Sequence, residues 1–172
     1  MVEVERLLTA APIEIQAVDP ADRDAQFCLR EYFAELDRRF DAGFDPALSI
    51  TGLDELRPPA GAFLVARLQG EPVGCGALVF SDDEPAYLKR MWVAESCRGL
   101  GIGRRLLEAL EAHASSAGAS AVKLETNKSL AEAISLYRSA GYREVDAFND
   151  EPYAHHWFEK HLGQQRVSSS RP

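Results

Sequence analysis

The chain has 172 residues, of which 46% are hydrophobic and 27% charged, a composition suited to one domain with a single core. Its formal net charge of −8 disfavours nucleic acid as a partner, because phosphates would be repelled. No run approaches the roughly 20 apolar residues that span a bilayer, and the acidic start "MVEVERLLTAAPIEI" lacks the basic first region of a signal peptide. The cysteines Cys28, Cys75 and Cys97 form no CxxC pair, so we expect a reduced, soluble, cytoplasmic protein.

The first half of the chain is predicted to form a strand, a helix and a run of strands. Residues 13–18 alternate as a strand does, and residues 21–40 carry apolar residues at close to helical spacing. Residues 41–61 hold three prolines and three glycines, which predicts an irregular connection. Residues 62–80 read as two strands around the turn "QGEP", and residues 86–94 as a third.

In the second half, strands and helices alternate. Residues 102–118 form an amphipathic helix, and "AVKLET" at 121–126 is a strand of the buried type. Residues 129–142 form a second helix, with Ser129 as N-cap, Glu132 completing a capping box and Gly141 ending the helix.

The last predicted elements are a strand pair within residues 142–148 and 153–162. Residues 1–163 are therefore expected to be one domain and residues 164–172 a disordered tail. This order favours an α/β (α+β) fold, with a mixed, mostly antiparallel central sheet and helices on both faces.

The segment "CRGLGIGRR" at 97–105 lies between a predicted strand and a predicted helix. Unpaired N–H groups at a helix N-terminus favour an anion, and Gly99, Gly101 and Gly103 let successive amides converge on it. Arg98 and Arg104 can add charged hydrogen bonds. The dinucleotide motif G-x-G-x-x-G is excluded by the arginine at 104, and a P-loop by the missing Lys-Ser/Thr pair.

These residues resemble the acetyl-coenzyme A motif of the GNAT superfamily of N-acetyltransferases, [R/Q]-x-x-G-x-[G/A], which here reads Arg98-Gly99-Leu100-Gly101-Ile102-Gly103. The resemblance extends over about residues 62–161 and more loosely over the first 60. The stretches "LRPPAGAFLVA" and "NDEPYAHHWFEK" resemble GNAT domains that elsewhere follow MarR-type DNA-binding modules, although this chain starts with no helix-turn-helix stretch.

The resemblance implies a coenzyme A site made from several segments. Main-chain groups of Met91, Trp92 and Val93 would bind the pantetheine arm like an added strand. Residues 98 to 104, namely Arg98, Gly99, Leu100, Gly101, Ile102, Gly103 and Arg104, would wrap the pyrophosphate, and Asn127 would contact the cofactor arm.

For catalysis, the resemblance implies direct attack of an amine on acetyl-CoA, with Tyr137 donating to the leaving thiolate. The alternative for Tyr137 is a structural core position, since it shares a helical face with Leu130, Ala133 and Ile134. The general base stays open among Glu31, Glu35, Glu84 and water, and the pair His155 and His156 is more typical of structural histidines. No metal-ligand spacing is present, so no metal is expected.

The expected function is acetyl-CoA-dependent transfer to the amine of a small-molecule or amino-acid-like acceptor. A protein or peptide N-acetyltransferase and a non-catalytic CoA-binding sensor are the alternatives. No nucleic acid or membrane partner is expected, and the resemblance makes a homodimer the candidate assembly.

Overall fold

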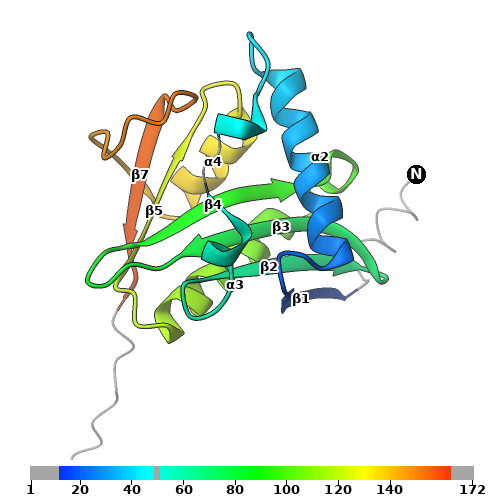
Figure 1. Ribbon diagram of the computed structural model, residues 1–172, viewed down its shortest axis with the longest axis horizontal. Coiled ribbons are helices and arrows are strands. Elements are labelled where there is room, and N and C mark those ends of the chain that lie inside the picture. Colours follow the sequence, from blue (N-terminus) through cyan, green and yellow to red (C-terminus); the bar gives the residue numbers. More distant parts are fainter. Residues whose placement is uncertain (1–11, 49–50, 164–172) are drawn as a thin grey trace, which may run out of the picture.

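The computed structural model describes residues 12–48 and 51–163, and these form a single seven-stranded sheet flanked by helices (Figure 1). The strands lie in the order β1-β2-β3-β4-β5-β7-β6. Their bounds are β1 Ile13–Ala17, β2 Gly61–Leu68, β3 Glu71–Val79, β4 Ala86–Val93, β5 Ala121–Thr126, β6 Arg143–Val145 and β7 His156–His161. The helices are α2 Arg23–Arg39, α3 Ile102–Ser116 and α4 Ala131–Ser139, with short 3-10 turns η1 Pro46–Leu48, η2 Leu53–Leu56 and η3 Glu95–Cys97. The predicted fold class is confirmed.

The strands pair antiparallel everywhere except between β4 and β5, which run parallel. The tight turn predicted between β2 and β3 is present, because Gln69 and Gly70 both have positive φ values, +51° and +81°. Two positive φ values are typical of the hairpin turns whose twist matches the flanking strands. The meander β1–β4 therefore forms from local connections.

The two faces of the sheet carry different helices, as Figure 1 shows, with α2 crossing one face and α3 and α4 covering the other. Ala25, Cys28 and Leu29 of α2 pack against strand residues that include Phe63 and Trp92. On the opposite face the apolar stripe of α3 is fully buried against the sheet; its members are Ile102, Leu106, Leu107, Leu110 and Ala114.

Strands β4 and β5 separate soon after they meet. They are paired only at Ala86–Val122 and Tyr87–Lys123, whereas β5 pairs with β7 along all six of its residues. An irregularity in the β3–β4 register lies beside Arg90, whose φ of +56° marks a bulge in β4. The rest of β4 therefore lies beside an opening in the sheet instead of beside β5.

The start predicted for the helix at residues 129–142 is wrong. Helix α4 begins at Ala131 with Leu130 as N-cap, and no side chain caps it. The Ser129 amide donates instead to Asn127 Oδ1 at 2.8 Å, and the Glu132 carboxylate pairs with Arg39 of α2. Tertiary contacts therefore replace the local capping box, while the predicted end of the helix at Gly141, with φ of +93°, is confirmed.

The two C-terminal strands are present and antiparallel but shorter than predicted, because residues 146–155 form a loop that turns back onto the sheet. Within the described residues no helix is long and apolar enough to cross a membrane. The predicted disordered tail, 164–172, lies outside the described residues, and the cytoplasmic location stays a prediction.

Candidate active site

A cavity of about 290 Å³ opens between β4, the start of α3, α2 and α4. Of the residues assigned to the cofactor from the sequence, Leu100 and Asn127 do not line this cavity. The other nine do: Met91, Trp92, Val93, Arg98, Gly99, Gly101, Ile102, Gly103 and Arg104. The separation of β4 from β5 thus brings the end of a strand and the glycine-rich loop to one cavity.

The three glycines of the loop serve two different purposes. Gly99 and Gly101 have φ values of +84° and +80°, and a Cβ built on either would meet no atom within 4 Å. A side chain there would be strained and would extend into open space at the cavity. Gly103 is helical, and a Cβ there would lie 3.1 Å from Leu136 Cδ2, so its role is the close approach of α3 to α4.

The N-terminus of α3 offers its backbone amides to the cavity. Its N-cap Gly101 makes no side-chain cap bond, and the first turn holds no acidic residue. The hydrogen bond from Arg105 N to Gly101 O is 3.1 Å, so the N–H groups of Ile102, Gly103 and Arg104 have no partner within the helix. Such a terminus is suited to an anion such as a phosphate.

Arg98 joins the glycine-rich loop to α2. Its Nε donates to Val93 O at 3.2 Å, and its Nη2 forms a close ion pair with Glu35 of α2. Arg104 donates to Ser139 Oγ at 2.7 Å. The side-chain bonds of both arginines therefore run to protein atoms in this structure.

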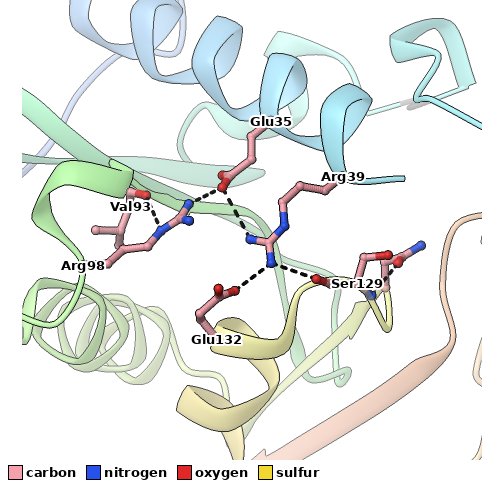
Figure 2. Close-up of polar contacts among 7 residues, drawn as sticks. Glu35, Arg39, Val93, Arg98, Ser129 and Glu132 are labelled. Atoms are coloured by element: carbon pink, nitrogen blue, oxygen red, sulfur yellow. Dashed lines mark hydrogen bonds and ion pairs between the residues drawn. The ribbon is translucent and has the colours of Figure 1, made fainter. Parts of the chain in front are cut away.

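Arg39 extends the same network from α2 to the start of α4, as Figure 2 shows. Its guanidinium lies 3.5 Å from Glu35, and its Nη2 donates to Glu132 Oε2 and to Ser129 O, both at 2.8 Å. Because Glu35, Arg39 and Glu132 all line the cavity, this network holds α2 and α4 together beside it.

Tyr137 of α4 lines the same cavity and is 5% exposed. Its ring contacts Tyr142 and Phe158, with centroids 5.8 and 6.2 Å away. Burial and then the nearby Glu125 carboxylate raise the pKa of the Tyr137 phenol. The hydroxyl is therefore protonated at neutral pH and can act as a hydrogen-bond donor.

A second, smaller cavity of about 100 Å³ lies beside the first. The two share Tyr32, Leu36 and Leu130 as lining residues. The second cavity combines aromatic rings of α2 and the following loop with charged residues of β4, β5 and the loop before β7; the charged ones are Lys89, Arg90, Glu125 and Glu151. It therefore differs from the first cavity in combining a polar, charged side with an aromatic one.

Glu125 of β5, in the second cavity, is the functional candidate that the sequence reasoning missed. Its Oε1 accepts a short hydrogen bond from the Tyr87 hydroxyl, which also accepts from Asn149 Nδ2 at 2.8 Å. Its Oε2 is buried and has no hydrogen-bond partner in the part of the chain that the structure describes. Burial raises the pKa of the Glu125 carboxyl, and the Glu151 carboxylate adds to the rise. An acidic residue near the end of the buried-type strand "AVKLET" was the available signal.

The other base candidates lie less favourably. Glu35 is engaged by two arginines, and the Glu84 carboxylate is exposed and 3.7 Å from Lys123 Nζ. Glu31 lines neither of the two cavities.

The two neighbouring histidines also lie outside both cavities. The His155 ring accepts a hydrogen bond from the Lys128 amide, and the His156 ring contacts the Glu144 carboxylate.

Asn127 lies at the second cavity with both ends of its amide occupied. Its Nδ2 donates to Tyr153 O at 2.8 Å, and its Oδ1 accepts from the Ser129 amide. These contacts fix the loop between β5 and α4. Among residues 12–48 and 51–163 no group of three or more histidine, cysteine or acidic side chains is placed to hold a metal ion.

The family profile described as "Acetyltransferase (GNAT) family" matches residues 25–142, more than half of the chain. The chain is 45% identical over 123 residues to the IAA acetyltransferase of Azospirillum brasilense, covering 69% of this chain and 78% of that one. It is 38% identical over 100 residues to the N-acetylaspartate synthetase of Rattus norvegicus, covering 54% of this chain and 31% of the rat protein. The chain therefore belongs to the GNAT acetyltransferase family and is an acyltransferase.

Solved structures show the same fold. A GNAT-family acetyltransferase from Staphylococcus aureus superposes with a TM-score of 0.74 at 20% identity, covering 88% of this chain and 100% of that one. A GNAT-family acetyltransferase from Elizabethkingia anophelis with acetyl-CoA bound gives a TM-score of 0.64 at 19% identity, covering 87% and 98% of the chains. The likeness to GNAT domains that follow MarR-type modules stays a prediction.

The raised pKa of Glu125 predicts a pH-dependent stability. A carboxyl whose folded-state pKa lies above its unfolded value of 4.5 contributes stability below that value and loses it as pH rises through the folded-state pKa. Glutamine does not ionise, so the free energy of unfolding of Glu125→Gln relative to the unmodified chain should rise with pH, by at most about 1.4 kcal/mol per pH unit. Urea unfolding of both proteins between about pH 4 and about pH 8 measures this difference. A difference that is flat or falls with pH would contradict the buried, ionisable environment of Glu125.

Proposed function

We propose that this protein transfers the acetyl group of acetyl-CoA to the amine of a small-molecule acceptor. The observation that carries the proposal is the adjacency of two cavities at the opening between β4 and β5. Tyr137 lines the first cavity and Glu125 the second. A proton donor, Tyr137, would thus lie on the acetyl-CoA side of the reacting atoms, and a proton acceptor, Glu125, on the amine side.

The first cavity has features that would suit two parts of coenzyme A, the pyrophosphate and the pantetheine arm. The open space over Gly99 and Gly101 and the free amides at the start of α3 suit the pyrophosphate, where Leu100 and Ile102 would contribute main-chain groups. Met91, Val93 and Leu136 give the cavity an apolar side that suits the pantetheine arm. When bound, acetyl-CoA supplies the thioester whose acetyl group is transferred. Asn127 would act indirectly, by holding the loop after β5.

The end of β4 would hold the arm through its main chain. Beyond Tyr87 this strand has no pairing to β5, so the edge formed by Met91, Trp92 and Val93 can receive an extended ligand as an added strand. The Val93 carbonyl is already occupied by Arg98 Nε, which leaves the groups before it for the ligand. An N–H of this edge would also polarise the thioester carbonyl.

Two side chains would then move protons. Oε2 of Glu125, which has no hydrogen-bond partner among the described residues, would take the proton that the amine loses as it attacks. A raised pKa brings this carboxylate closer to the working pH of a general base. The Tyr137 hydroxyl would donate a hydrogen bond, and finally its proton, to the leaving sulfur. Because both pKa values are shifted by burial, the chemistry would run in a largely dry site.

The small acceptor is supported by the size of the second cavity, about 100 Å³ against about 290 Å³ for the first. The name of the rat relative, N-acetylaspartate synthetase, specifies a small amine-bearing molecule as what that protein acetylates. We propose the same class of acceptor, a small amine-bearing molecule, for this chain, but not the particular acceptor of the rat protein.

Thiol release tests the proposal. Purified protein would be mixed with acetyl-CoA and a panel of small amines, amino acids and short peptides, and free coenzyme A would be followed with a thiol reagent. We expect release that depends on a small amine or amino acid. Transfer to peptides alone would contradict the acceptor class, and tight coenzyme A binding without transfer to any amine would contradict the proposed reaction.

The change Tyr137→Phe should lower kcat by about a hundredfold, because the leaving thiolate loses its proton donor. The dissociation constant for coenzyme A should stay within about twofold. Tyr142→Phe is the matched control, since it also removes a buried phenol that contacts the same aromatic cluster but lies outside both cavities. Equal kcat values for the two variants would assign Tyr137 a structural role only.

Gly101→Ala should weaken coenzyme A binding by about tenfold or more, because its Cβ enters the space assigned to the pyrophosphate. Gly118→Ala is the control: its φ of +96° imposes a comparable backbone strain of about 1–2 kcal/mol, but Gly118 lines neither cavity. Isothermal titration with coenzyme A compares the two. Equal affinities would argue against the pyrophosphate position.

A further inference from the structure

The second cavity is lined by both cations and carboxylates. Lys89 and Arg90 of β4 line it together with Glu125 and Glu151. Lys89 and Glu125 are close enough to influence each other's pKa, yet no salt bridge joins them in the described part of the chain. A cation and a carboxylate thus line the same small cavity.

The ammonium of Lys89 is only partly satisfied by the protein. Its Nζ donates to Thr51 Oγ1 at 2.6 Å and lies 4.8 Å from the centre of the Tyr87 ring. An ammonium has three N–H donors, and one hydrogen bond occupies it within the described residues, so it can also donate to a ligand. Burial lowers the pKa of Lys89, because the ammonium is partly removed from water. An anion in the cavity would relieve that cost.

Arg90 places a second positive charge in the same wall. The bulge in β4 holds its backbone at φ +56°, and its Nη2 donates to Thr51 O at 2.7 Å. Its guanidinium also lies 5.5 Å from the centre of the Phe33 ring. These contacts fix its position, so the charge beside Lys89 is preorganised.

Strand β5 contributes to the second cavity the group that would face an amine. Glu125 keeps one carboxylate oxygen, Oε2, without a hydrogen-bond partner among the described residues. A molecule with an amine at one end and an acid group at the other would satisfy Glu125 and Lys89 at once. An amine without an acid group would form no ion pair with the Lys89 ammonium.

Resting on the acetyl transfer proposed above, we propose that the acceptor is a small amine that also carries a carboxylate, as an α-amino acid does. Lys89 binds the carboxylate, with Arg90 adding positive potential, and the amine faces Glu125. Lys89 is thus the residue that determines specificity.

Aromatic rings complete the cavity on the side of α2 and the following loop. Phe33, Phe40, Phe44 and Tyr153 contact one another with ring centroids 4.8 to 5.9 Å apart. This apolar wall can contact the side chain of an amino acid. It also limits water, which strengthens the pairing between the acid group and Lys89.

Matched acceptors test the proposal on the unmodified protein. Thiol release would be measured with leucine, leucinamide and 3-methylbutylamine, and again with phenylalanine, its amide and phenethylamine. Each amide has nearly the shape of its acid and a more readily deprotonated amine, but no negative charge. Of leucine and phenylalanine, we expect the better acceptor to have a kcat/KM that exceeds that of its own amide by about tenfold or more.

Variants test the assignment to Lys89. Lys89→Met should raise KM for the amino acid and lower the ratio of kcat/KM for the acid to kcat/KM for its amide by about tenfold or more. Lys89→Arg should keep most of that ratio. Lys128→Met makes the same change of charge at an exposed lysine of the nearby loop and should leave the ratio of acid to amide unchanged. Isothermal titration with coenzyme A, and with leucine in the presence of coenzyme A, separates lost acceptor binding from misfolding.

The outcomes are distinguishable. Amides or plain amines used as well as the acids would overturn the inference while leaving the acetyl transfer intact. An acid preference that survives in Lys89→Met, with coenzyme A bound normally, would overturn the role of Lys89. Transfer to no amine would overturn the proposed function, and with it this inference.

Discussion

Both cavities depend on the separation of β4 from β5. The two parallel strands share only two paired positions, because β4 stays hydrogen-bonded to β3 while β5 is held along its whole length by β7. The bulge at Arg90 adds a bend in β4 at the same place. The strand edge left open, the loop that follows it and the start of α3 therefore surround one space, and the end of β5 lies beside it.

The separation also explains where charge is buried. Lys89, Arg90 and Glu125 line the second cavity at the opening. Burial opposes the charged forms of all three, as the direction of each pKa shift shows. Groups held at such a cost to stability are typical of functional sites. Helix α2 closes the opening, since Tyr32 and Leu36 line both cavities and Glu35 and Arg39 tie the helix to the loop and to α4.

Elements whose determinants are local were predictable from the sequence. The hairpin at Gln69 and Gly70, the apolar stripe of α3 and the helix end at Gly141 each follow from residues within a few positions of one another. The start of α4 was not predictable in this way. The Ser129 amide bonds Asn127 and the Glu132 carboxylate bonds Arg39, and a local capping pattern contains neither contact. The same holds for the loop of residues 146–155, which the sequence suggested was partly strand.

By itself, the sequence determined the fold class and the glycine-rich loop before α3, because glycines of positive φ before an amphipathic helix are a short-range feature. Only the tertiary structure decided which carboxylates line the two cavities. Glu125 is one of many acidic residues in the chain, and what distinguishes it is the hydroxyl of Tyr87 and a buried oxygen that has no partner among the described residues. Those properties arise when β5, β4 and the loop before β7 are packed together, so they depend on residues distant in the sequence.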